Sequence, residues 1–185
     1  MKETPILATK RLVLRPLALS DAARIQLLFP HWEIVQHLAA VVPWPYPQDG
    51  ALTYLRDVAL PGMERGSEWY WVLCLRNAPG ALIGVISLAD NEHDNRGFWL
   101  GLRWQRRGLM SEAVATVNDV WFDDLKRPAL RVQKAAANEA SRRISLSTGM
   151  RMVCTGEKDF VCGHLPMERW EQSAKEWQTH RGVRP

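Results

Sequence analysis

The segment GFWLGLRWQRRGLMSEA, residues 97–113, decides which fold this chain adopts. Its apolar first part, residues 97–102, is typical of a strand, and apolar residues then recur at helical spacing from 109 to 122. Between them lies a basic turn that contains Gly108, a residue that permits a positive φ and the close approach of a ligand. The first N–H groups of the following helix have no partner inside it, and the helix dipole adds positive charge. The segment therefore predicts a turn that binds an anion such as a pyrophosphate.

Strands and helices follow on both sides of this turn in a regular order. Apolar alternation and turn residues predict strands at residues 11–15, 69–75, 82–88, 97–102, 130–136, 150–155 and 161–170. Helix caps, prolines and apolar spacing predict one helix after Ser20-Asp21 and others at residues 32–38, 48–60, 109–122 and 138–147. This order predicts a mixed α/β domain with one central sheet, and it differs from the order of a Rossmann domain.

Length, cysteine content and charge restrict the class of protein. A chain of 185 residues with 46% hydrophobic residues can bury one sizeable core, so we expect a single domain over residues 1–185. We find no export signal and no apolar stretch near the ~20 residues of a membrane helix, which predicts a cytoplasmic protein without membrane contact. The three cysteines lack Cys-x-x-Cys spacing, so neither a disulfide framework nor a metal site is expected. The net charge of +4 is dispersed, and we expect no direct binding of nucleic acid.

Several motifs occur in a fixed order around the turn. They are TKRLVLRP (9–16), WPYP (44–47), LIGVI (82–86), QRRGLM (105–110) with its following Ser-Glu-Ala, and NEAS (138–141) followed by TGM (148–150). Together they resemble the GNAT superfamily of N-acetyltransferases, and within it the RimJ/RimL-like branch. The pyrophosphate loop of that superfamily reads Gln/Arg-x-x-Gly-x-Gly/Ala. Met110 departs from the last position, and Arg106 stands where the branch often has glycine.

The resemblance implies a fold and a co-substrate. The fold is the GNAT fold, with a mostly antiparallel mixed sheet flanked by helices and a splayed fourth strand, and the co-substrate is acetyl-coenzyme A. Backbone amides of Leu100 and Leu102, where the fourth strand would bulge, are implied to contact the acetyl carbonyl and the pantetheine arm. The implied contacts of the turn and the helix start are Gln105, Arg106, Arg107, Gly108, Leu109, Met110 and Ser111.

The motif NEAS supplies two further candidates. The resemblance implies that Asn138 holds the pantetheine chain and that Ser141, on the same helix face, donates a proton to the leaving thiolate. Simple capping by Asn138 and a serine that bonds backward within its helix are the structural alternatives. Because no tyrosine follows Tyr70, a tyrosine acid late in the chain is excluded.

The base and the acceptor site carry a weaker signal. Asp90, Glu92 and His93 lie after the third predicted strand, near the implied substrate entrance, and of these we choose Glu92 as the general base. Three polar residues in a turn are otherwise simply solvated. Trp44 and Tyr46 are implied to contact the acceptor, since relatives place this stretch beside the acceptor groove.

The predicted function is transfer of acetyl from acetyl-coenzyme A to an amine. The resemblance makes a protein N-terminal α-amine, of the ribosomal-protein type, the first choice of acceptor. A small amine such as an antibiotic or a polyamine is the second choice. A module that binds acyl-coenzyme A without turnover is the alternative from another class. A homodimer is compatible with each of them.

Overall fold

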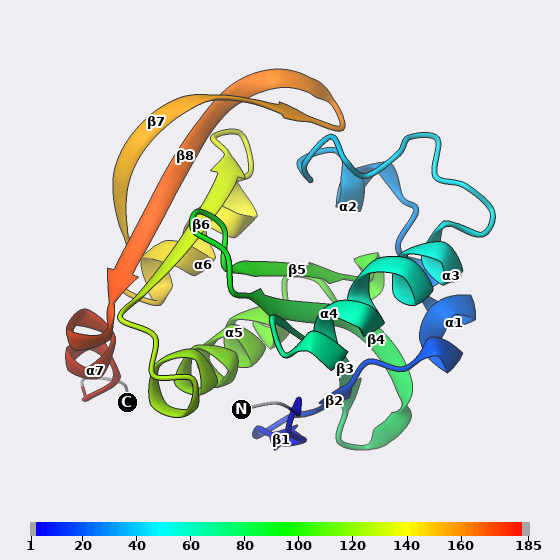
Figure 1. Cartoon of the computed structure of the whole chain (residues 1–185), viewed down its shortest axis with the longest axis horizontal. Helices are drawn as coiled ribbons and strands as arrows, with labels where there is room; N and C mark the ends of the chain where they lie inside the picture. The colour runs from blue at the N-terminus through cyan, green and yellow to red at the C-terminus, as the bar shows by residue number, and fades with distance from the viewer. Residues whose placement is uncertain (1–2, 183–185) are drawn as a thin grey trace.

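The computed structural model describes residues 3–182 and divides the strands between two sheets (Figure 1). The two ends of the expected domain, 1–2 and 183–185, lie outside the described residues. The larger sheet is antiparallel in the order β1-β2-β3-β4-β5. Its strands are β1 (Leu7–Ala8), β2 (Leu12–Pro16), β3 (Glu68–Leu75), β4 (Ala78–Ala89) and β5 (Arg96–Leu100). The smaller antiparallel sheet has the order β6-β8-β7, with β6 (Ala129–Ala135), β7 (Arg151–Phe160) and β8 (Gly163–Ser173).

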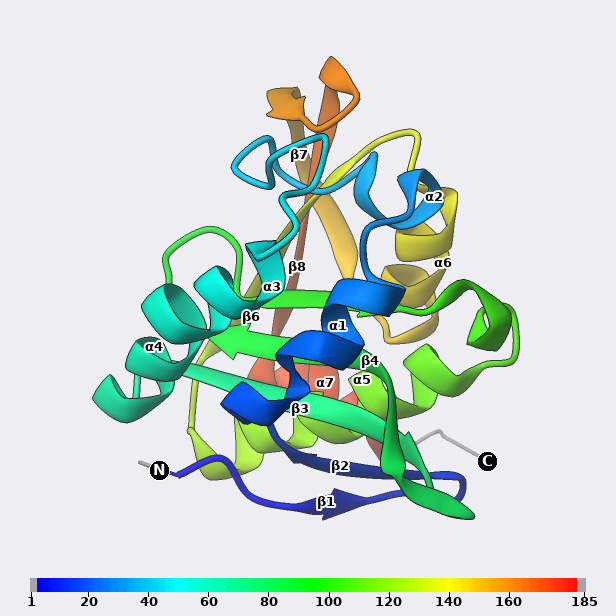
Figure 2. The same cartoon turned by 90° about the vertical axis from the view of Figure 1, so that its right-hand side faces the viewer.

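Helices cover both faces of the larger sheet, with α1 in front of it and α5 behind it in Figure 2. The helices are α1 (Ala22–Leu28), α2 (Trp32–Val35), α3 (Gly50–Tyr54), α4 (Leu60–Arg65), α5 (Leu109–Asp119), α6 (Glu139–Ser147) and α7 (Ala174–Gly182). On the α5 face, Trp71 and Ile86 of the sheet are buried against Val114 of the helix. On the other face, Val72 is buried with residues of α1 and α3. Burial of both faces explains why β3 is almost continuously apolar.

β5 and β6 lie side by side only where they begin. The Asn95 N–H donates to the carbonyl of Arg131 (2.7 Å), and the Arg131 N–H donates to Oδ1 of Asn95 (2.7 Å). From there β5 pairs with β4 and β6 pairs with β8, and the two strands diverge (Figure 1). The chain thus has two sheets where one was predicted, because the strands part at this contact. The parting confirms the splay that was expected for the fourth predicted strand, which is β5.

The tip of the β7–β8 hairpin pairs with the segment that follows α2. Ala39 forms a β-bridge with Phe160, and the N–H groups of Val161 and Cys162 donate to the carbonyls of Leu38 and Gln36 (3.0 Å each). Both views show the hairpin reaching toward this segment (Figures 1 and 2). The contact ties the hairpin of the smaller sheet to the segment that follows α2.

The observed boundaries depart from the predicted ones at several ends. The strand predicted at 97–102 ends at Leu100, and residues Leu102–Trp104 form a 3-10 turn instead. The helix predicted at 48–60 is interrupted by a π-helical turn at Leu55–Ala59, and α7 was not predicted. Within residues 3–182, no helix is long and apolar enough to cross a membrane.

Candidate active site

A cavity of about 480 Å³ lies where the two sheets part. Its lining comes from four places: the end of β5, the turn into α5, the exposed face of α6, and α2 with the residues after it. Eight of the predicted coenzyme contacts line it: Leu100, Gln105, Arg106, Gly108, Leu109, Met110, Ser111 and Asn138. Ser141 lines it as well. The cavity therefore brings together segments from both halves of the chain.

The turn into α5 has the backbone geometry of an anion site. Gly108 is the N-cap of α5 with φ +71, a left-handed conformation that favours glycine. The first bond within the helix runs from the Glu112 N–H to the Gly108 carbonyl (3.2 Å), so the N–H groups of residues 109–111 precede the helical bonding pattern. Arg106 is also left-handed, with φ 58, although it carries a side chain. A glycine at that position, as in the resembling branch, would suit the same backbone.

Side chains from inside and outside the motif hold this turn in place. Gln105 Nε2 donates to the Leu100 carbonyl (2.8 Å) and so ties the turn to the end of β5. Arg11 Nη1 donates to the Arg107 carbonyl (2.8 Å), and its Nε forms an ion pair with Glu112 (2.7 Å). The Arg107 side chain is exposed and does not line the cavity. The sequence analysis missed the role of Arg11, whose only signal was its place in the opening strand motif.

The free edge of β5 offers backbone groups to the cavity. The bonds from Gly101 N–H to Ile83 and from Ala89 N–H to Asn95 (2.9 Å each) fix the alternation of the β4–β5 ladder. In this register Gly97 and Trp99 hydrogen-bond to β4, whereas Phe98 and Leu100 direct their N–H and C=O groups to the opposite edge. The Leu100 carbonyl already accepts a hydrogen bond from Gln105 Nε2, and both residues line the cavity.

Leu102 lies differently from what the sequence predicted. β5 pairs with β4 in continuous register, so the expected bulge is not present in this ladder. Leu102 follows the strand in the 3-10 turn, is 39% exposed, and is not part of the cavity lining. The edge amides that face the cavity belong to Phe98 and Leu100, because residues two apart on a strand share an edge.

The first turn of α6 presents Asn138 and Ser141 to the cavity. Asn138 is the N-cap, and its Oδ1 accepts the N–H of Ser141 (3.1 Å), so the capping alternative holds for its oxygen. Within residues 3–182, the Ser141 hydroxyl makes no hydrogen bond, and the backward bond to the helix is not formed. The hydroxyl is therefore available to a ligand in the cavity.

The loop before β5 contains the three base candidates and a further carboxylate, Asp94. Glu92 is 83% exposed and lies 3.7 Å from His93, and neither residue lines the cavity. Asp90 is paired with Arg127 (2.5 Å). Asp94 does not line the cavity either; it lies where β5 and β6 part, and its Oδ1 accepts the Gln133 N–H of β6 (3.1 Å).

Burial raises the pKa of the Asp94 carboxyl. The Gln133 N–H and the positive charges of Lys158, Lys134 and Arg96 oppose this rise. A half-buried carboxyl with a raised pKa at the junction of two strands is a candidate proton acceptor. Asp94 was not among the base candidates chosen from the sequence, because its partial burial depends on contacts with β6 that no local pattern reports.

The two aromatic residues expected at the acceptor lie beside the cavity and do not line it. Tyr46 packs edge-on against Phe29 (ring centroids 5.1 Å apart), and Phe29 packs against Trp99 (5.3 Å), which does line the cavity. Burial raises the pKa of Tyr46 to about 12. Trp44 is 42% exposed and contacts Trp32 (5.6 Å).

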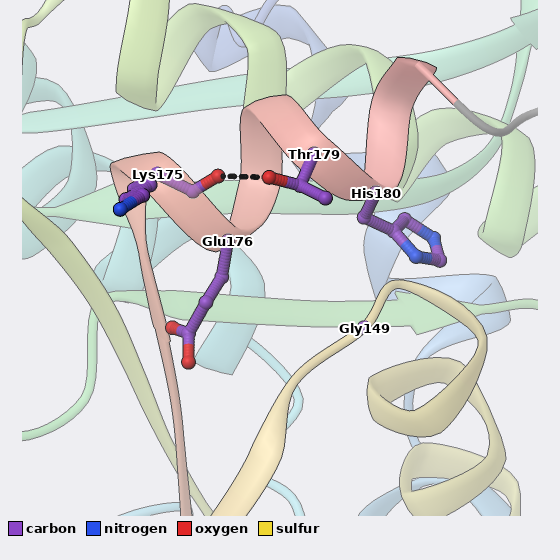
Figure 3. A pocket seen from close by; sticks show the side chains of 5 residues that line it. All are labelled: Gly149, Lys175, Glu176, Thr179 and His180. Atoms are coloured by element: carbon purple, nitrogen blue, oxygen red, sulfur yellow. Dashed lines mark hydrogen bonds between the residues drawn. The ribbon is translucent and has the colours of Figure 1, made fainter.

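A second cavity lies beside α7 and contains none of the predicted residues. It has a volume of about 490 Å³ and is lined by Gly149, Lys175, Glu176, Thr179 and His180 (Figure 3). Thr179 donates to the Lys175 carbonyl (3.0 Å), Glu176 accepts bonds from Ser173, and His180 contacts the Ser147 carbonyl (3.1 Å). These local bonds occupy its polar groups. Over residues 3–182, no three His, Cys, Asp or Glu side chains are grouped so that they could hold a metal ion.

Comparison with known proteins identifies the family. The model of the "Acetyltransferase (GNAT) domain" matches residues 11–151. A similar solved structure is RimL, a ribosomal L7/L12 alpha-N-protein acetyltransferase in complex with coenzyme A (TM-score 0.77, 16% identity, 91% of this chain and 98% of that chain covered). Another is the ribosomal-protein-S5-alanine acetyltransferase from Vibrio fischeri (TM-score 0.78, 16% identity, 94% and 98% covered). A third is the microcin C7 self-immunity acetyltransferase MccE in complex with acetyl-CoA and AMP (TM-score 0.73, 15% identity, 89% and 93% covered).

No curated protein matches the chain significantly. The solved structures share the fold at low sequence identity, whereas the family model covers most of the sequence. The chain therefore belongs to the GNAT family of acetyltransferases, enzymes that use acetyl-coenzyme A as the acetyl donor.

Proposed function

We propose that this acetyltransferase modifies a protein N-terminal α-amine, with a ribosomal protein as the first candidate. One observation carries the proposal of the site: the edge amides of β5, the N-terminus of α5 and the first turn of α6 all face one cavity. Two of the similar structures are ribosomal-protein acetyltransferases, which supports this class of acceptor. The family assignment favours an enzyme over a module that only binds acyl-coenzyme A.

The residues of the cavity fit a pyrophosphate followed by an extended polar arm. The N–H groups of residues 109–111 and the Arg106 side chain suit the phosphates, because amides at a helix N-terminus and a guanidinium group both bind anions. The edge groups of Phe98 and Leu100 suit an amide-containing chain that runs along β5, as a neighbouring strand would. Asn138 borders the same path with its amide nitrogen unused by the helix cap.

Each step of the acetyl transfer is then assigned to a group of this chain. Acetyl-coenzyme A supplies an acetyl group activated as a thioester. An edge N–H of β5 polarises the acetyl carbonyl, which favours attack by the amine nitrogen and loss of the C–S bond. Ser141 donates its proton to the departing sulfur, giving the free thiol of coenzyme A, and its hydroxyl regains a proton from water; the hydroxyl is free and faces the cavity. Asp94 accepts the proton that leaves the amine, directly or through water.

Asp94 is a better candidate base than Glu92. A base must be close to the reacting groups and must hold its proton more tightly than an exposed carboxylate does. Asp94 is half-buried at the junction of β5 and β6, and this desolvation raises its pKa. Glu92 is 83% exposed, so solvent screens it and leaves it free to move. Glu92 stays in the proposal as the second choice.

A small-molecule amine is the second candidate for the acceptor. The similarity to MccE supports it, because that structure contains AMP beside acetyl-CoA. Trp44, which is exposed, and Tyr46, which is half-buried, serve either class, since aromatic rings contact both peptide chains and planar small molecules.

A pair of peptides tests the choice of acceptor. The two peptides have the same sequence; one has a blocked N-terminus and a free lysine, and the other has the reverse. We expect faster acetylation of the free α-amine by mass spectrometry. Preferential modification of lysine would exclude the α-amine while leaving the acetyltransferase assignment intact. Reaction with polyamines or aminoglycosides, and with neither peptide, would support the small-amine alternative.

Two further parts of the proposal concern the cellular compartment of the enzyme and its oligomeric state. We place it in the cytoplasm, where ribosomal proteins are made. We also propose a homodimer, because β7 is the outer strand of its sheet and is exposed along most of its length. Sedimentation of the full chain would show a mass of about twice the 21.1 kDa of one chain.

A further inference from the structure

Lys134 is a buried lysine that contacts the helix carrying Ser141. It lies on β6, and its side chain points into the layer between the smaller sheet and α6, where the residue is 4% exposed. Nζ donates to the Ser141 carbonyl (3.1 Å) and to the Ser145 hydroxyl, two groups one helical turn apart. The ring of Trp170 lies 5.4 Å from Nζ.

The charged groups around Lys134 leave its ammonium group without an ion pair. Asp94, before β5, and Glu168, on β8, favour the charged amine, whereas Arg96 on β5 and Arg142 on α6 oppose it. Glu168 is already engaged by Arg142 and by the indole N–H of Trp170 (2.9 Å each). Among the described residues, no carboxylate lies within ion-pair distance of Nζ.

Such a lysine is costly for the fold. Burial lowers the pKa of Lys134 to about 7, so solvation would favour moving the charge into water. An apolar side chain of the same length would fill the space without this cost. Stability alone therefore does not account for a lysine at this position.

The contacts of Lys134 fix the backbone of Ser141. The Ser141 N–H is held by Asn138 (3.1 Å) and its carbonyl by Lys134 (3.1 Å), so both polar groups of this peptide segment have a side-chain partner. Lys134 does not line the cavity, whereas Asn138 and Ser141 do. Any effect of Lys134 on a ligand in the cavity must therefore pass through α6.

We propose that Lys134 is a positioning residue that clamps the first turn of α6 to β6 and thereby aims the Ser141 hydroxyl into the donor cavity. The inference rests on the proposed function of Ser141. It goes beyond that function because it assigns the orientation of the Ser141 hydroxyl to Lys134, a buried amine on β6.

The test combines turnover with amide hydrogen exchange in the full-length protein. Lys134→Met removes both bonds and leaves an apolar side chain that is one atom shorter, Ser145→Ala removes one bond, and Lys175→Met, at an exposed residue of α7, is the control. For Lys134→Met we expect kcat to fall on the order of tenfold, with KM for acetyl-coenzyme A changed by less than about threefold. Ser145→Ala should show a smaller loss in the same direction, and Lys175→Met none.

A double variant separates positioning from an independent effect. Because Lys134 acts through Ser141, adding Lys134→Met to Ser141→Ala should lower kcat no further. Amides in the first turn of α6 should exchange faster in Lys134→Met than in the parent and the control. Multiplicative losses in the double variant, or unchanged exchange, would overturn the inference. If Ser141→Ala alone is as active as the parent, the acid role fails, and the exchange data still decide whether Lys134 clamps the helix.

Discussion

The donor part of the site and its acceptor part are made from different kinds of groups. The donor part, at the turn 105–111 and the edge of β5, consists mainly of backbone amides whose direction is set by a helix start and a strand register. The proposed acceptor part, at the loop 90–94 and the stretch 44–47, consists of side chains. The position of these side chains depends on contacts between distant segments, such as Asp94 with Gln133 and Tyr46 with Phe29.

This difference explains how far each part tolerates change. A backbone site depends on the few residues that permit its conformation, and here Gly108 is the main one. A side-chain site depends on each named group, and its chemistry is lost when that group changes. Substitutions should therefore affect the donor part through conformation and the acceptor part through chemistry.

The largest effect should come from Asp94→Asn, which keeps the shape and the bond to the Gln133 N–H but cannot accept a proton. We expect kcat to fall by about 10²-fold or more, the contribution typical of a general base. Because burial raises the pKa of Asp94, the parent should also lose activity at a pH above the ordinary carboxyl value as the pH falls. That limb should be missing in the variant.

Steady-state kinetics over pH, with Glu92→Gln and Asp90→Asn alongside, measure this effect. Both exposed carboxylates should be replaceable with little loss. A larger loss for Glu92→Gln than for Asp94→Asn would return the base to the residue that the sequence favoured.

Gly108→Val should come next. A β-branched residue is strained at φ +71, and its Cβ would meet Nη2 of Arg11 at 3.4 Å, the side chain that holds the turn. We expect the affinity for acetyl-coenzyme A to fall by roughly 10- to 100-fold, which corresponds to about 1.4–2.8 kcal/mol. Titration calorimetry measures it, and Gly80→Val is a matched control because a Cβ at Gly80 meets no atom within 4 Å. Equal affinity in the Gly108 variant and the parent would remove the turn from the donor site.

More of the residues predicted for the donor part than for the acceptor part line the cavity, for the same reason. Gly108 and the helix start lie within a few residues of each other, so a local motif contains the whole turn. The strand edge was predicted two residues too far along, because only the β4–β5 register shows which amides face outward. The burial of Asp94 and the contacts of Lys134 arise between elements far apart in the chain, and no local pattern reports them.

A smaller effect concerns stability and pH. Burial lowers the pKa of Lys134 from 10.5 to about 7. Between these values the unfolded chain binds a proton that the folded chain lacks, so the unfolding free energy of the parent should rise as the pH rises through this range. Lys134→Met should therefore be about 1–4 kcal/mol more stable than the parent near neutral pH, with the difference shrinking toward about pH 10. Urea unfolding at both pH values measures it, and a difference independent of pH would contradict the buried charge.

The smallest effect should come from Arg106→Gly, which separates the backbone conformation of the turn from the charge of the arginine. Arg106 has φ 58, and a glycine relieves a left-handed strain of about 1 kcal/mol while adding a similar entropic cost to folding. We therefore expect the unfolding free energy to change by less than about 0.5 kcal/mol. The exposed guanidinium is lost, and the affinity for acetyl-coenzyme A should fall by only about two- to fivefold, less so at high salt.

Lys126→Gly is the matched control, because Lys126 is also exposed, also has φ near that value (54), and lies outside the cavity lining. The two variants should have equal stabilities, and only Arg106→Gly should weaken coenzyme binding. A loss of affinity as large as that of Gly108→Val would mean that the arginine charge, and not the backbone of the turn, provides most of the donor site.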